Sequence, residues 1–131
     1  MKNVLVVGGS GFLGSALACA LKERGLFVRV FDLKTHPDPN IESVSGDLRN
    51  PEQVQAACQG IDTVFQTASL VDWGPRSRER LWAINVTGNR NVIVACQKLG
   101  VKRLIYTSSI DVVFDGHPIT HGDESLPYPS R

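Results

Sequence analysis

Residues 4–14 read VLVVGGSGFLG, and this stretch decides the fold. Its four leading apolar residues predict a buried strand, the glycines predict a tight turn, and the apolar spacing that follows predicts a helix. Two glycine triplets fit the turn. Gly9, Gly11 and Gly14 follow G-x-G-x-x-G, whereas Gly8, Gly11 and Gly14 follow the wider G-x-x-G-x-x-G.

The glycines have separate physical roles in such a turn. The first permits a sharp turn with positive φ, Gly11 lets the backbone approach a pyrophosphate, and Gly14 lets the helix pack closely on the strand. The N–H groups at the helix start then face the phosphates, helped by the helix dipole. The stretch therefore predicts a dinucleotide site. We expect the cofactor to be bound by Gly8, Ser10, Gly11, Phe12, Leu13 and Gly14.

Asp32 ends the next apolar run, residues 27–31, at the distance that this motif requires of an acidic residue. A carboxylate there can accept hydrogen bonds from both ribose hydroxyls in the adenosine half of a nicotinamide dinucleotide. It would repel a 2′-phosphate by roughly 1–4 kcal/mol at contact distance. The sequence therefore favours NAD over NADP, a preference that Lys34, two residues on, would soften. The alternative is that Asp32 only caps a turn.

Apolar strands alternate with amphipathic helices, which predicts an α/β fold with a doubly wound, Rossmann-like parallel sheet. The predicted strands are residues 3–7, 27–32, 41–46, 61–67 and 102–108. The predicted helices are residues 12–24, 51 to near 60, and 76–99, the last one bent near Gly88; residues 34–40 and 69–75 are predicted loops, and the pattern breaks up from residue 110. Ligands of such sheets bind beyond the carboxyl ends of the strands, where small and polar residues gather here.

The composition indicates one globular domain. The chain has 131 residues and a net charge of +1, which is too small for a nucleic-acid or membrane-surface footprint. No apolar run approaches the ~20 residues of a membrane span, and residues 1–7 lack a cleavable signal pattern. Cys19, Cys58 and Cys96 are odd in number and without C-x-x-C spacing, which favours reduced thiols in a cytoplasmic protein.

Two further groups of side chains could suggest sites. His117 and His121 are four residues apart, but Pro118 and Gly122 argue against a helix that would align them, so we expect no metal site. Trp73, in the loop that follows residue 69, is a candidate contact for an apolar substrate. Trp82 is equally explained by such a contact and by core packing.

Several motifs together resemble the extended short-chain dehydrogenase/reductase superfamily, and within it the 3β-hydroxysteroid dehydrogenase/isomerase and sterol-4-carboxylate dehydrogenase group. Residues 8–14 match the cofactor loop, and residues 46–49 (GDLR) resemble the segment that contacts the adenine. Residues 66–69 (QTAS) match a segment in which His is usual where this chain has Gln66. We expect that departure to be tolerated.

The remaining motifs extend the resemblance over the whole chain. Residues 85–92 (NVTGNRNV) match a mid-helix motif, residues 106–109 (YTSS) match the strand that delivers a catalytic Ser, and residues 123–129 (DESLPYP) resemble the loop before the catalytic helix. The resemblance implies Ser109 as the catalytic Ser, or Ser108 if the motif is aligned one residue off; capping of the strand end is the alternative for both. It also implies cofactor contacts from Leu33, Asp47, Leu48, Thr67, Ala68, Ser69, Thr107 and Ser108.

Asn85 is a polar residue inside a predicted buried helix. We expect it to hydrogen-bond backbone and brace the active site; the alternative is a plain solvent-facing Asn. The resemblance implies hydride transfer between NAD and a secondary hydroxyl of a sterol-like or other bulky apolar substrate, with a Tyr-x-x-x-Lys pair as the base.

That pair is absent from these residues. Tyr106 is followed four residues later by Ile110, and Tyr128 has no residue at that offset. In the family's order the pair comes shortly after Arg131, so we expect residues 1–131 to be the NAD(P)-binding Rossmann domain of a longer enzyme, inactive without the base and the substrate-binding region.

Two other functions stay open. A nucleotide-sugar epimerase or dehydratase uses the same cofactor loop, although residues 112–116 (VVFDG) look more sterol-type than sugar-type, where Val-Tyr-Gly is usual. A non-catalytic NAD(H)-binding module is favoured if the Tyr and Lys are truly lacking. Many relatives dimerise through a four-helix bundle, which would make residues 76–99 a homodimer contact.

Overall fold

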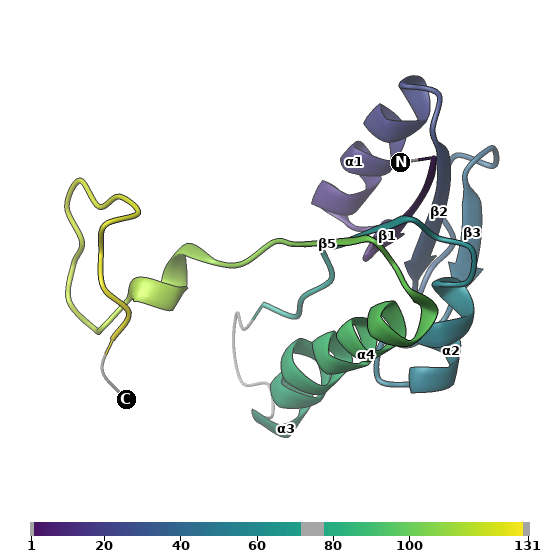
Figure 1. Cartoon of the computed structure of the whole chain (residues 1–131). Coiled ribbons are helices and arrows are strands. Elements are labelled where there is room, and N and C mark those ends of the chain that lie inside the picture. The colour runs from purple at the N-terminus through teal and green to yellow at the C-terminus, as the bar shows by residue number, and fades with distance from the viewer. Residues whose placement is uncertain (1, 72–77, 130–131) are drawn as a thin grey trace.

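The computed structural model describes residues 2–71 and 78–129, and it contains the expected parallel sheet of the Rossmann type (Figure 1). The strands are Asn3–Val7 (β1), Phe27–Asp32 (β2), Glu42–Ser45 (β3), Thr63–Gln66 (β4) and Arg103–Tyr106 (β5), in the order β3-β2-β1-β4-β5. The α-helices are Phe12–Glu23 (α1), Pro51–Ala57 (α2), Arg78–Trp82 (α3) and Asn89–Leu99 (α4). A π-helical stretch, Ala83–Gly88 (η1), joins α3 to α4, and a 3-10 helix, Ile110–Val113 (η2), follows β5. Within the described residues, no helix has the length and apolar character needed to cross a membrane.

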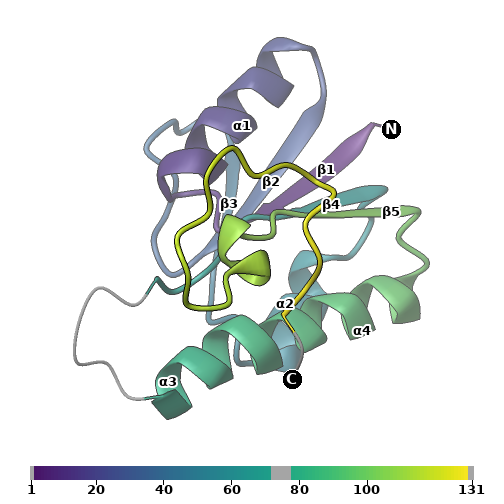
Figure 2. The same ribbon diagram turned by 90° about the vertical axis from the view of Figure 1, so that its left-hand side faces the viewer.

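The sheet is covered on both faces, as a doubly wound fold requires (Figures 1 and 2). Side chains of β1 alternate between the faces, so Val4 and Val6 join a core cluster with Leu21 of α1. Leu5 and Val7 join the opposite cluster, which contains residues of α2 and α4. Burial on both faces explains why β1 is a continuous apolar run and not an alternating one.

Several elements differ at their ends from the prediction. The strand predicted at 61–67 is Thr63–Gln66, because the Ile61 N–H closes the turn after α2 by donating to the Cys58 carbonyl (3.3 Å). The strands predicted at 41–46 and 102–108 are also shorter, at Glu42–Ser45 and Arg103–Tyr106. The Ile41 N–H lies in a turn and donates to the Asp38 carbonyl (3.2 Å). Residues 12–24 and 27–32 were predicted to within one residue.

The helical stretch predicted at 76–99 is helical from Arg78 to Leu99, but its centre is π-helical where a bend near Gly88 was predicted. The side-chain amide of Asn89 donates to the Asn85 carbonyl (2.6 Å), an oxygen that would otherwise accept the main-chain N–H of Asn89. That N–H donates to the Val86 carbonyl instead. A side chain that enters the main-chain ladder in this way changes the local helix.

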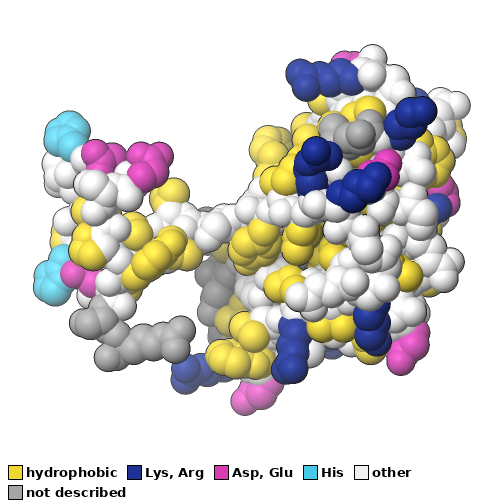
Figure 3. Space-filling view, in the orientation of Figure 1, with side chains coloured by type: hydrophobic (Ala, Val, Ile, Leu, Met, Phe, Trp, Pro, Cys, Tyr) yellow, Lys and Arg dark blue, Asp and Glu magenta, His cyan; other side chains and the backbone are white. Residues whose placement is uncertain are grey.

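Strand β5 is the edge of the sheet, and all four of its residues are exposed. The chain leaves the sheet at the carboxyl end of β5 and forms an arm that extends away from the body (Figures 1 and 2). Figure 3 shows hydrophobic side chains on the surface of the domain that faces this arm. The arm therefore leaves β5 uncovered.

All three cysteines are free. Cys58, which follows α2, and Cys96 of α4 are both buried in the same core cluster. The neighbouring Cys96 thiol and burial together raise the pKa of the Cys58 thiol. Both thiols therefore act as core side chains in the structure.

Candidate cofactor-binding site

The glycine turn after β1 is packed against both neighbouring strands. Gly8 has a φ of 79°, and a Cβ at this position would lie 2.7 Å from the main chain of Ala68. A Cβ at Gly14 would lie 2.2 Å from the Gly8 carbonyl oxygen. The turn glycine with positive φ is thus Gly8, which favours the wider triplet, while Gly9 packs against Val30.

The start of α1 is open. Its N-cap is Gly11, no side chain caps it, and its first turn carries no acidic residue. The first N–H groups of a helix have no partner within the helix, and the positive end of the dipole lies there. Phe12 is fully exposed and Leu13 is half-exposed. This arrangement suits a phosphate group.

Asp32 lies beside the glycine turn. One carboxylate oxygen accepts the Ser10 N–H (3.0 Å), and the other lies 3.5 Å from the Lys34 N–H nitrogen. The Ser10 hydroxyl donates to the Lys34 carbonyl (2.8 Å), which ties the two loops together. A carboxylate has about four acceptor positions, so these contacts leave capacity for a ribose diol. Capping and ligand binding are compatible at this residue. Leu33 beside it is 71% exposed.

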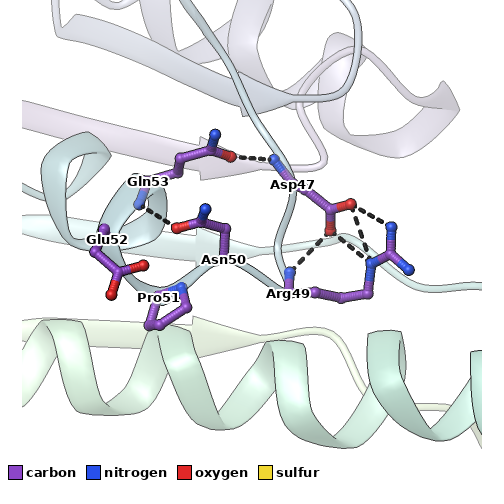
Figure 4. Close-up of a pocket in the computed structure, with 6 residues that line it drawn as sticks. All are labelled: Asp47, Arg49, Asn50, Pro51, Glu52 and Gln53. Atoms are coloured by element: carbon purple, nitrogen blue, oxygen red, sulfur yellow. Dashed lines mark hydrogen bonds and ion pairs between the residues drawn. The ribbon is translucent and has the colours of Figure 1, made fainter.

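The loop after β3 forms a shallow pocket (Figure 4). Its lining residues are Asp47, Arg49, Asn50, Pro51, Glu52 and Gln53. Arg49 folds back on Asp47, with its Nη2 donating at 2.5 Å and its main-chain N–H at 2.9 Å. These contacts lower the pKa of Asp47, so its carboxylate is held in the ionised form.

Leu48, predicted as a cofactor contact, has a side chain that lies in the core and is only 8% exposed. It packs on Gly88, and its carbonyl accepts a hydrogen bond from Asn91 Nδ2 (3.0 Å). Only its main chain is therefore available to a ligand, a restriction that the sequence motif did not indicate.

The loop after β4 is held by side-chain amides. Gln66 Nε2 donates to the Ala68 carbonyl (3.1 Å), and Gln66 Oε1 accepts the Ala68 N–H (3.2 Å). Asn85 makes the same pair of bonds to Leu70, both at 2.8 Å. Ser69 lies between these two clamped residues and is exposed. Asn85 therefore hydrogen-bonds backbone, as expected, and its place in catalysis stays a prediction.

Thr67 and Thr107 close the ends of β4 and β5. The Thr67 hydroxyl donates to the Val7 carbonyl (2.7 Å), and the Thr107 hydroxyl donates to the Gln66 carbonyl (3.0 Å). Each bond ties a strand end to the neighbouring strand. The structure therefore brings the loops after β1, β2 and β4 and the end of β5 to one edge of the sheet.

Ser108 and Ser109 are exposed at the start of the arm. The Ser109 hydroxyl accepts the Asp111 N–H (3.1 Å) and donates to the Asp111 carboxylate (3.1 Å), so it caps η2. The alternative for this residue was capping of the strand end, whereas the bond observed caps the helix that follows. Its catalytic role stays a prediction.

The other sequence candidates are less informative. Trp73 lies outside the described residues, whereas Trp82 is 61% exposed, so core packing does not explain it. His117 pairs with Asp115 in the exposed arm. Over residues 2–71 and 78–129, no three metal-ligating side chains gather at one point. Asn91, which bonds the Leu48 carbonyl, and Asn89, which bonds Gln66 and the Asn85 carbonyl, were not singled out from the sequence, although both lie in the 85–92 motif.

Comparison with known families matches residues 5–131 to the 3-beta hydroxysteroid dehydrogenase/isomerase family. The chain belongs to this family. A 3-beta-hydroxysteroid dehydrogenase from Mycolicibacterium neoaurum is 44% identical over 98% of the chain, and the chain spans 38% of that protein. A mouse sterol-4-alpha-carboxylate 3-dehydrogenase, decarboxylating, is 41% identical over 97% of the chain, which spans 35% of that protein.

Solved structures of the wider short-chain dehydrogenase/reductase superfamily share this family member's fold. A superfamily protein from Agrobacterium tumefaciens with bound NAD is similar with a TM-score of 0.88 and 30% identity, over 99% of this chain and 40% of that one. A UDP-glucose 4-epimerase from Thermus thermophilus in complex with NAD has a TM-score of 0.84 and 28% identity, over 98% of this chain and 44% of that one.

Proposed function

We propose that these residues form the NAD(H)-binding part of an oxidoreductase that acts on a secondary hydroxyl or ketone of a sterol-like or other bulky apolar substrate. The observation that carries the proposal is the open start of α1 beside the glycine turn, with the Asp32 carboxylate on the neighbouring strand. The reaction and the substrate class are supported by the names of the relatives, which are a 3-beta-hydroxysteroid and a sterol-4-alpha-carboxylate dehydrogenase.

NAD is the proposed cofactor and NADP the disfavoured one. The Asp32 carboxylate lies at the end of β2, where the adenosine ribose is expected, and it carries the charge that a 2′-phosphate would meet. NAD-bound solved relatives support the same choice. Lys34, two residues after Asp32, would moderate this preference through its positive charge.

The bound nicotinamide would accept or return a hydride. Ser109 would donate a hydrogen bond to the substrate oxygen as charge develops there, after releasing Asp111. Neither Tyr106 nor Tyr128 is followed by Lys four residues later, so we place the base that takes the hydroxyl proton beyond these 131 residues. The three free cysteines favour a place in the cytoplasm.

Titration of the chain with NADH and NADPH, followed by nicotinamide fluorescence, tests the cofactor site. We expect saturable NADH binding and NADPH binding at least about fivefold weaker, from the charge repulsion at Asp32. If neither NADH nor NADPH bound, the proposal would be overturned. Oxidation of a 3β-hydroxysterol by the full-length protein tests the substrate class.

A nucleotide-sugar epimerase is the second candidate, because the UDP-glucose 4-epimerase structure has almost the same backbone. Turnover of UDP-glucose by the full-length protein, with no turnover of a sterol, would favour it. Activity with neither substrate and intact NADH binding would favour the non-catalytic module.

We also propose that residues 76–99 form a homodimer contact. Within the described part of this region, Trp82, Val86 and Ile93 are each more than 40% exposed. Sedimentation of the full-length protein should give a dimer, and Val86→Glu with Ile93→Glu should shift it to a monomer.

A further inference from the structure

The side-chain amides of Gln66 and Asn89 form a network with the main-chain carbonyl of Asn85 and the hydroxyl of Tyr106 at the carboxyl end of β4. Gln66 Nε2 donates to Asn89 Oδ1, and Asn89 Nδ2 donates to the Asn85 carbonyl (2.6 Å) and to the Tyr106 hydroxyl (3.2 Å). Asn89 thus connects the Gln66 amide, which clamps Ala68, to the main chain of Asn85, whose side chain clamps Leu70. Asn89 itself bonds to neither clamped residue. The network connects β4, η1, α4 and β5.

Gln66 is a costly residue for a central strand. It is 2% exposed among apolar neighbours, and a buried amide costs free energy unless all its polar atoms are bonded. Here each of its side-chain polar atoms has a partner: Oε1 accepts from Ala68, and Nε2 donates to Ala68 and to Asn89. A saturated polar network of this kind fixes one arrangement of the groups around it.

The arrangement that is fixed is the loop from Ala68 to Leu70. This loop lies against the glycine turn, since Gly8 has no room for a Cβ beside Ala68. Asp32 and the loop after β3 lie on the opposite half of the sheet, because the strand order is β3-β2-β1-β4-β5. With the adenosine half of a dinucleotide over β2 and β3, the loop after β4 faces the nicotinamide half.

We infer that Gln66 and Asn89 are positioning residues for the nicotinamide half of the cofactor. They fix the position of the 68–70 loop beside the glycine turn. Ser69 then lies exposed between two hydrogen-bonded residues, Ala68 and Leu70. This inference rests on the proposed NAD(H) function. Asn91 on the same helix has the matching task on the adenine side, where it holds the Leu48 carbonyl (3.0 Å).

The test compares Asn89→Ala with Asn91→Ala as the matched control. Both residues are half-buried asparagines of α4. Asn91 bonds directly to the loop after β3, whereas Asn89 acts on the loop after β4 through Gln66 and Asn85, and Ala is the best helix former. The ligands are NADH and ADP-ribose, which lacks the nicotinamide. Asn89→Ala should weaken NADH binding about 5- to 10-fold, as expected for one or two lost hydrogen bonds, and ADP-ribose binding less than about twofold. Asn91→Ala should weaken both ligands by the same factor.

A second variant guards against misfolding. Tyr106→Phe removes only an exposed hydroxyl that accepts from Asn89, and it should change NADH binding in the same direction by about twofold. Amide hydrogen exchange in the unliganded chain supplies an independent readout. In Asn89→Ala, exchange of the Ala68 and Leu70 N–H groups should speed up, although Asn89 bonds to neither.

Equal loss of NADH and ADP-ribose binding in Asn89→Ala, or unchanged exchange at Ala68 and Leu70, would overturn the inference alone. If the unmodified chain bound ADP-ribose and not NADH, the nicotinamide role would fail while a nucleotide site remained. If it bound neither, the proposed function itself would fail and the inference with it.

Discussion

Asp32 joins two tasks in one side chain. Its carboxylate holds the glycine turn through the Ser10 N–H (3.0 Å) and places a negative charge at the end of β2. The hydrogen bond needs only an acceptor, whereas the discrimination against a 2′-phosphate needs the charge. Substitution by the isosteric amide separates the two tasks.

In Asp32→Asn, the affinity for NADPH relative to NADH should rise about fivefold or more, because roughly 1–4 kcal/mol of repulsion is removed. Parallel titrations with both nucleotides measure this ratio. Asp38→Asn, which removes a charge from the following loop, is the control and should leave the ratio unchanged. A ratio that moved equally in both variants would assign the effect to net charge.

Substitution by Ala should affect stability at Gly14 and NADH affinity at Gly11. A Cβ at Gly14 meets the Gly8 carbonyl at 2.2 Å, so Gly14→Ala should lower the free energy of unfolding by about 1–3 kcal/mol. A Cβ at Gly11 meets that oxygen at 3.2 Å, so Gly11→Ala should fold nearly normally and lose NADH affinity instead. Urea unfolding and NADH titration of both variants test this separation. Equal unfolding free energies would contradict it.

At the scale of elements, η1 and α4 supply the side chains that hold the main chain of the site in place. Asn85 holds the loop after β4 and its carbonyl accepts from Asn89. Asn91 holds the loop after β3, and Gly88 permits close packing on Leu48. A Cβ at Gly88 would lie 2.7 Å from Leu48 Cδ2, inside the contact distance of two carbon atoms. Leu48 is buried and has little room to move.

Gly88→Ala should therefore lower the free energy of unfolding by about 1 kcal/mol, since overpacking costs about 1–3 kcal/mol and better helix propensity returns up to about 1 kcal/mol. Thr87→Ala, at the exposed neighbouring position, should be neutral or slightly stabilising. Urea unfolding of both variants measures the difference. If Gly88→Ala were as stable as the parent, the Leu48 side chain could move away from the new methyl group without a loss in the free energy of unfolding.

At the scale of the whole molecule, Asp62 ties together the amino ends of β1, β4 and β5. Its carboxylate accepts the N–H groups of Lys2 (3.0 Å) and Asn3 (3.1 Å), and its carbonyl accepts the N–H groups of Lys102 and Arg103. The two main-chain donors, with Lys102 nearby, lower the pKa of Asp62 from its ordinary 3.8 to about 2. A depressed pKa means that the ionised form stabilises the fold above pH 3.8 and that this contribution is lost as the pH falls toward 2.

The urea midpoint should consequently fall between pH 4 and pH 2, the window set by the lowered pKa of Asp62. In Asp62→Asn the fall should be shallower, because an amide accepts the same bonds without titrating. Asp115→Asn, in the exposed arm, should leave the slope of the parent unchanged. If the urea midpoint of Asp62→Asn fell with pH as steeply as that of the parent, the Asp62 carboxylate would not contribute to the loss of stability in acid.

The strand–turn–helix motif, the acidic end of β2 and the alternation of strands with helices were all readable from the sequence, because each depends on local chemistry: glycine where a side chain would collide, apolar residues where both faces are covered. Tertiary structure alone decided the rest. The bonds from Gln66 to Asn89 and from Asn91 to Leu48 form only when β4, α4 and the loop after β3 meet. Leu48 turns inward only because Gly88 leaves it space. These hydrogen bonds join residues that are 23 and 43 positions apart in the sequence. A local sequence pattern cannot predict such pairs, because they form only when the elements pack together.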